Sequence, residues 1–286
     1  MWNKQSHYWD TIGRHPMKLT YRSIQPFCAG IDVAVDKPLI DLSQITGFSP
    51  YGIVYLGMYL RYHNNCNAKY FRVCNMSEEV EDYLSSQNFW KRFNFQPSPD
   101  FDTSFVRTHH DTRFGDIVEL TSHLWLADEV EDILTELLRL HHATFPIAEY
   151  AIAVGELVDN FVQHAGVIQG AMMVEYNSDM STLSIALGDY GKGIRQSLFD
   201  SGNQPGLASA THADAIEKAF QPGVTGKKEG GMGFTEVQSI VTEHRGTLFL
   251  SSFDGAVILD DCGMMYKMKA PYSLPGVQIE LTLPAR

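Results

Sequence analysis

The chain has 286 residues, 44% hydrophobic and 20% charged, which favours folded, core-forming domains and excludes a disordered chain. Its formal net charge of −12 argues against a general nucleic-acid binder, which needs clustered lysine and arginine, but allows one local nucleotide site. The length suits two domains, and four scattered cysteines without ligand spacing indicate neither a disulfide framework nor a zinc site.

Residues 1–30 are aromatic and mixed, without a clean period, and we expect an irregular lead-in. They lack the apolar run of a signal peptide, and no later stretch has the apolar length that crosses a bilayer. With four thiols expected to be reduced, these features predict a cytoplasmic protein without a membrane span.

Residues 31–120 alternate strand and helix signals. Residues 39–42 predict a short buried strand, and a turn over 46–50 should lead into a helix. Residues 69–74 predict a second strand, and Ser77 should open a second helix. This alternation predicts a small α/β unit with parallel strand pairing.

The same segment resembles a STAS-like domain, the fold of the anti-sigma factor antagonists. Asp41-Leu42-Ser43 stands where that family has a strand-ending Asp-Leu-Ser. The resemblance implies a regulatory or docking surface for a protein partner. The antagonists carry a phosphorylatable serine at the start of the next helix, but Pro50 occupies that place here, so we expect no phosphorylation there. Ser49 is better explained as the helix N-cap.

Residues 94–116 have the composition of a connection. His109 and His110 lack acidic or cysteine partners at ligand spacing, so we expect them at the surface. An amphipathic helix is predicted from Asp128, with acids in its first turn as the helix dipole favours. We place the change to a second domain, residues 121–286, before this helix.

A helix predicted over 151–166 organises the second domain. Its core stripe is expected to contain Ile152, Leu157, Phe161 and Val162. Glu156, Asn160 and His164 recur every four residues on a different stripe. A carboxylate and a carboxamide one turn apart can take a proton and coordinate Mg²⁺. For this segment alone, a polar stripe that is simply solvated is the simpler interpretation.

Two strand-like runs follow, at 171–176 and 183–187, and the short turn between them predicts a hairpin. The second run leads into Asp189, with Gly191 and Gly193 two and four residues later. A carboxylate at a strand end beside bare backbone can accept a hydrogen bond from an exocyclic amine on a planar ring. An ordinary Asp-x-Gly turn is the alternative.

Residues 195–230 form a long connection interrupted by glycine and proline, with a short helix predicted over 213–220. Such connections in compact domains tend to be lids or binding loops. The connection ends in a glycine-rich run before a further helix, where Gly231, Gly233 and Lys227 could hold a phosphate at the helix N-terminus.

In order, Glu156-x-x-x-Asn160, Asp189-x-Gly191-x-Gly193 and Gly231-x-Gly233 resemble the N, G1 and G2 boxes of the GHKL superfamily. That superfamily includes gyrase B, Hsp90, histidine kinases and MutL, and the anti-sigma kinases are nearest. Runs 246–252 and 276–284 look like the last strands of a histidine-kinase ATPase domain, so the resemblance covers about residues 125 to 286. It implies a Bergerat-type α/β sandwich, a mixed sheet layered with helices.

The resemblance also implies ATP and Mg²⁺ as cofactors. It implies that Asn160 binds the metal ion, that Asp189 binds the adenine and that Glu156 acts as the general base. The other nucleotide-binding positions that it implies are His164, Gly191, Gly193, Thr225, Lys227, Gly231 and Gly233, under a lid of roughly residues 200–230. Two positions depart from the family pattern: Gln163 replaces a phosphate-contacting lysine, and Val277 replaces a threonine near the adenine.

Three functions remain open. The first is a Mg-dependent ATPase-type conformational switch in bacterial signalling, regulated through the STAS-like domain. The second is a serine/threonine kinase of the anti-sigma type, and the third is a non-catalytic ATP-binding interaction module. A conventional histidine kinase is disfavoured because His141 and His142 lack the acidic and Arg-x-x-Pro-like neighbours of an acceptor histidine. The sequence leaves a homodimer open.

Overall fold

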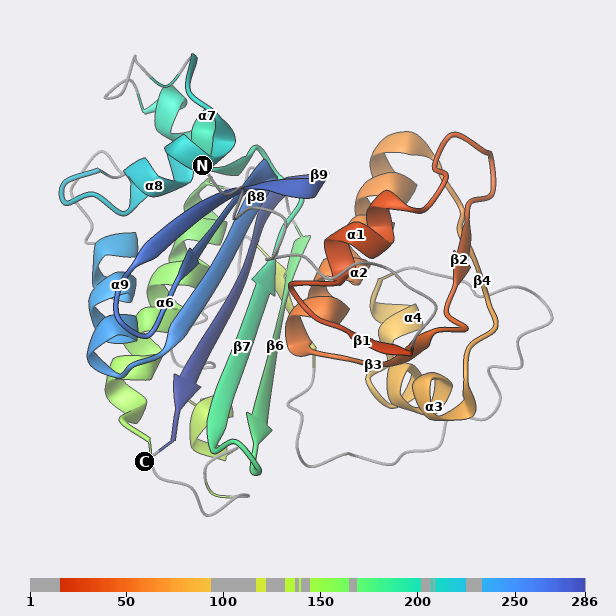
Figure 1. Cartoon of the computed structure of the whole chain (residues 1–286), viewed down its shortest axis with the longest axis horizontal. Helices are drawn as coiled ribbons and strands as arrows, with labels where there is room; N and C mark the ends of the chain where they lie inside the picture. The colour runs from red at the N-terminus through yellow and green to blue at the C-terminus, as the bar shows by residue number, and fades with distance from the viewer. Residues whose placement is uncertain are drawn as a thin grey trace, which may run out of the picture. The chain divides into compact units, whose positions relative to one another are not determined.

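The computed structural model describes residues 16–93, 117–121, 132–136, 139, 145–164, 169–201, 207, 209–224 and 233–285. The chain divides into two compact units, Met1–Asp111 and Thr112–Arg286 (Figure 1). Both contain helices and strands, which confirms the α/β class. None of the helices in these ranges combines the length and apolar composition that crossing a membrane requires. His109 and His110 lie outside the described residues.

The N-terminal unit contains two short parallel strand pairs, β1 with β3 and β2 with β4. Its elements are β1 (Met17–Leu19), α1 (Ile24–Ala29), β2 (Leu39–Asp41), β3 (Ile45–Phe48), α2 (Pro50–Asn67), β4 (Arg72–Cys74), α3 (Glu78–Ser86) and α4 (Phe89–Arg92). The parallel pairing of the two predicted strands, now β2 and β4, is therefore confirmed.

Helix α2 forms the centre of this unit. Ser49 caps it by accepting the N–H of Gly52 at 3.2 Å, and Pro50 is its first residue, as predicted. Every residue from Pro50 to Arg61 is buried, so the helix has no solvent-facing stripe over three turns. A Cβ at Gly52 would lie 2.2 Å from the Leu19 carbonyl oxygen, so the absence of a side chain lets β1 pack directly on the helix.

Two predictions about this unit were wrong. The expected turn over 46–50 is mostly strand β3, which pairs with β1 so that Leu19 lies opposite Phe48 and both are buried. Part of the expected irregular lead-in forms β1 and α1, where Ile24 and Cys28 are fully buried. In both places tertiary pairing outweighs local turn propensity, because it buries side chains far apart in sequence.

The C-terminal unit is built on a five-stranded sheet in the order β5-β6-β7-β9-β8. Its elements are β5 (Val118–Thr121), α6 (Ile147–His164), β6 (Gln169–Asn177), β7 (Thr182–Gly188), α7 (Gly193–Asp200), α8 (His212–Ala219), α9 (Phe234–Glu243), β8 (Thr247–Leu259) and β9 (Met265–Pro284). Residues 132–136 and 139 are also helical, within the stretch where a helix was expected from Asp128.

The strand directions differ from the mixed sheet that we expected, because every pairing between the described strands is antiparallel. The predicted hairpin between β6 and β7 is confirmed, and β8 and β9 form a second hairpin. β7 and β8 point in the same direction, but β9 returns between them and pairs with both. The chain therefore crosses from β7 to β8 through helices, but these two strands are not hydrogen-bonded to each other.

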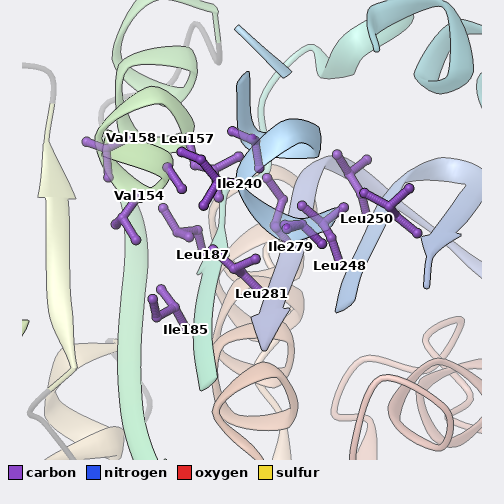
Figure 2. Close-up of a cluster of buried hydrophobic side chains, with 14 of the residues drawn as sticks. Val154, Leu157, Val158, Ile185, Leu187, Ile240, Leu248, Leu250, Ile279 and Leu281 are labelled. Atoms are coloured by element: carbon purple, nitrogen blue, oxygen red, sulfur yellow. The ribbon is translucent and has the colours of Figure 1, made fainter. Parts of the chain in front are cut away.

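Helices α6 and α9 lie side by side on one face of the sheet (Figure 1). Figure 2 shows Leu157 of α6 and Ile240 of α9 turned toward apolar side chains of the sheet. The predicted core stripe was wrong at Ile152, which is 47% exposed. The buried face of α6 instead consists of Tyr150, Ala153, Val154, Leu157, Val158 and Phe161, at the three- and four-residue spacing of one helix face.

Leu281→Ala should lower the free energy of unfolding of the C-terminal unit by about 2–5 kcal/mol, because Leu281 is fully buried in β9, an interior strand of the sheet. Ile152→Ala, on the exposed side of α6, should cost less than about 1 kcal/mol. Urea unfolding followed by circular dichroism measures both. Equal costs for the two substitutions would contradict this account of the core.

Candidate functional site

A pocket in the C-terminal unit lies where α6, the end of β7, the start of α7 and the start of α9 meet. Its apolar walls include Leu120, Leu157, Leu187, Ile194, Val277 and Ile279. The polar side chains among its described lining residues are Asn160, Asp189 and Ser197. Asp189 is the one ionisable side chain in that set, so this pocket suits a mostly apolar group with few polar contacts.

The structure brings together several of the residues singled out in the sequence. Asn160, Asp189, Gly193 and Gly233 all line the pocket, although together they span more than seventy residues of the chain. Glu156 lies one turn before Asn160 on α6 and is not among the lining residues. Thr225, Lys227 and Gly231 lie outside the described residues, and His164 ends α6 with its side chain outside the described ones.

Asp189 follows directly after β7, as predicted, and is only 4% exposed. Its backbone N–H donates to the Val277 carbonyl at 3.0 Å, and its Oδ1 accepts the Gly191 N–H at 2.7 Å. Burial raises the pKa of the Asp189 carboxyl to about 7, although the backbone hydrogen bonds of Gly191 and Val277 act in the opposite direction. The carboxyl group is therefore held in one place but is costly to ionise.

A bulge in β9 closes over Asp189. Ser251 pairs with Gln278 and Phe253 with Leu274, so β9 has extra residues between these two pairs. Gly276 lies in that bulge with φ 88°, and a Cβ there would be 2.5 Å from the Asp189 Oδ1. Gln278 donates from Nε2 to the Asp189 carbonyl at 2.6 Å.

Sequence reasoning did not identify Gly276 or Gln278 as site residues. The available signal was a glycine inside a predicted strand, which often marks a bulge or a close backbone approach. Gln278 gave no signal at all, because its partner is 89 residues away in the chain.

The amide nitrogen of Asn160 is buried and has no hydrogen-bond partner among the described residues. A buried amide without a partner costs free energy, so such groups usually meet water or a ligand. Because the amide can turn over, the same position can present either its NH₂ group or its oxygen to the pocket. Asn160 is therefore suited to contact a ligand atom or a hard cation.

The N-terminus of α9 also faces the pocket. Gly233 is the N-cap residue, with φ 52° and ψ −139°, and both it and Phe234 line the pocket. Glycine has no side chain to accept the first N–H groups of the helix, and these groups carry the positive end of the helix dipole. This end of the pocket consequently favours an anionic group.

No protein-family model matches the chain. Over 74 residues it is 38% identical to the sensor histidine kinase ZraS of Escherichia coli O157:H7. The similar stretch is 26% of this chain and spans only 15% of that protein. Part of the chain is thus similar to part of a sensor histidine kinase.

The pH dependence of stability should reveal the buried carboxyl. The native state keeps a proton on Asp189 up to about pH 7, whereas the unfolded chain releases it near the ordinary value of 3.8. Between these values the unfolded state binds fewer protons, so Asp189 lowers the free energy of unfolding as the pH rises. Asp189→Asn cannot titrate and should remove this loss.

The free energy of unfolding of Asp189→Asn minus that of the wild type should therefore rise between about pH 4 and about pH 7, by up to about 4 kcal/mol, and then level off. Urea titrations of both proteins across this range measure the difference. A difference independent of pH would show that Asp189 titrates as an exposed carboxyl does.

Proposed function

We propose that the C-terminal unit binds ATP with Mg²⁺ in this pocket and acts as an ATPase-type conformational switch. The observation that carries the proposal is the convergence of Asn160, Asp189 and Gly233 on one mostly apolar pocket. An acceptor for a base, an amide for a metal ion and a helix N-terminus for phosphate are the separate requirements of a magnesium–nucleotide site.

The base fits the end of the pocket formed by Asp189. The apolar side chains of Leu187, Ile194 and Val277 can cover the faces of a purine, and Gly193 adds no Cβ. The Asp189 carboxylate accepts a hydrogen bond from an exocyclic amine, and adenine carries one. Val277 has no hydroxyl group that could form a further hydrogen bond with the base, so recognition of the base depends strongly on Asp189.

The phosphates and the metal ion fit the other end. Asn160, whose buried amide has no partner among the described residues, would hold Mg²⁺, while the N-terminus of α9 at Gly233 would face the phosphates. Bound Mg²⁺ supplies neutralisation of phosphate charge. Glu156, one turn before Asn160, is the candidate base for activating a water.

The similarity of part of the chain to part of a sensor histidine kinase supports an ATP-binding role. For the N-terminal unit we propose a STAS-like regulatory role with a surface for a protein partner. Pro50, at the start of α2, disfavours phosphorylation of the chain on its own N-terminal unit, and for this reason we favour hydrolysis over protein phosphorylation.

Above about pH 7, where the Asp189 carboxyl is ionised, Asp189→Asn should weaken ATP binding by about tenfold or more, because the base loses its charged acceptor. Calorimetric titration with ATP and Mg²⁺ measures the change. The exposed Asp179, in the turn between β6 and β7, provides the matched control, and Asp179→Asn should leave the affinity unchanged. Wild-type affinity in Asp189→Asn would contradict the assignment of the base site.

Glu156→Ala should reduce turnover of γ-labelled ATP by about a hundredfold or more while ATP still binds, because a general base contributes at that scale. The control is Glu243→Ala, which removes an exposed carboxylate at the end of α9. Release of free phosphate by the wild type supports the switch. Label transferred to a protein band would indicate a kinase instead, and binding without turnover would indicate an ATP-binding module.

A further inference from the structure

A buried serine in β8 joins the two segments that form the base end of the pocket. Ser252 is fully buried, and its hydroxyl accepts the N–H of Ile194 at 3.3 Å and donates to the Gly276 carbonyl at 2.7 Å. Ile194 is in the first turn of α7 and lines the pocket, whereas Gly276 is in the β9 bulge against Asp189. One hydroxyl thus links the first turn of α7 to the β9 bulge that lies against Asp189.

Helix α7 depends on this contact at its N-terminus. Its own N-cap residue, Lys192, makes no side-chain capping hydrogen bond. The first N–H groups of a helix need acceptors, and caps normally come from the preceding residue. Here the acceptor for Ile194 comes from Ser252, 58 residues further along the chain.

The surrounding residues leave little freedom for this contact. A Cβ at Gly193, which has φ 72°, would lie 2.7 Å from the Ser252 hydroxyl, so only glycine lets α7 approach β8 this closely. On the other side, Gly276 approaches Asp189, whose carbonyl also accepts the Gln278 amide. The Ser252 hydroxyl thus connects the close approach of α7 to β8 at Gly193 with the close approach of the β9 bulge to Asp189 at Gly276.

We propose that Ser252 is a positioning residue for nucleotide recognition, which fixes α7 and the β9 bulge around Asp189 without touching the ligand. This inference rests on the proposed function for its ligand. It predicts a selective effect: loss of the hydroxyl disturbs the base end of the pocket and leaves the phosphate end at α9 as it was.

The test compares two probes, ADP with Mg²⁺ and inorganic tripolyphosphate with Mg²⁺. Ser252→Ala should weaken ADP binding by about tenfold and tripolyphosphate binding by less than about twofold, because only the base end loses its hydrogen bonds. Ser252→Cys nearly keeps the volume but hydrogen-bonds weakly, and it should show the same selectivity to a smaller degree. Amide hydrogen exchange at Ile194 should be faster in both variants.

Ser23 is a matched control in the other unit. It is fully buried, and its hydroxyl likewise accepts one N–H, from Thr20 at 2.9 Å, and donates to one carbonyl, of Lys18 at 2.8 Å. Ser23→Ala should cost a similar amount of stability and change neither affinity.

The outcomes separate this inference from the proposed function. Equal weakening of both probes in Ser252→Ala, or unchanged ADP affinity in both Ser252 variants, would overturn the positioning role. If wild-type protein binds tripolyphosphate but not ADP, or binds neither, the proposed function fails, and the role of Ser252 in nucleotide recognition fails with it. Exchange at Ile194 then reports only whether Ser252 caps α7.

Discussion

The C-terminal unit is organised around one buried carboxyl group. Asp189 is at the end of β7, beneath a bulge of β9 and beside the start of α7, in a pocket whose walls are mostly apolar. Burial opposes its ionisation, and the Gly191 N–H only partly offsets that cost. A fold that keeps an acid in such surroundings loses stability at neutral pH, which is typical of a position retained for recognition or catalysis.

The helices on the sheet connect this carboxyl to the rest of the proposed site. At one end of the helix pair, Glu149 near the start of α6 contacts His244 at the end of α9, and the Tyr150 hydroxyl donates to the Pro284 carbonyl. At the other end, Asn160 and Gly233 line the pocket. The two helices therefore run antiparallel and are fixed to each other away from the pocket. Both helices contribute to one apolar cluster with side chains of β7, β9 and β8 (Figure 2).

Local signals in the sequence predicted several parts of this arrangement. The cap at Ser49, the hairpin of β6 and β7, and the position of Asp189 after a strand each depend on neighbouring residues. The prediction for Ile152 failed because it lies five residues before Leu157 but four before Glu156, so it shares the stripe of Glu156 and not the core stripe. β3 and the strand directions failed because they depend on pairing partners far along the chain. Gly276, Gln278 and Ser252 act through such distant contacts, so a single sequence gave little sign of them.

The most direct test of the central claim is an amide-resolved NMR titration with ADP and Mg²⁺. The account predicts that the amide signals of Gly191, Gly193 and Gly233 shift together and saturate with one common dissociation constant, because the base and the phosphates occupy one pocket. Absence of any shift at these three amides, or shifts that saturate at different ADP concentrations, would contradict a single nucleotide site built around Asp189.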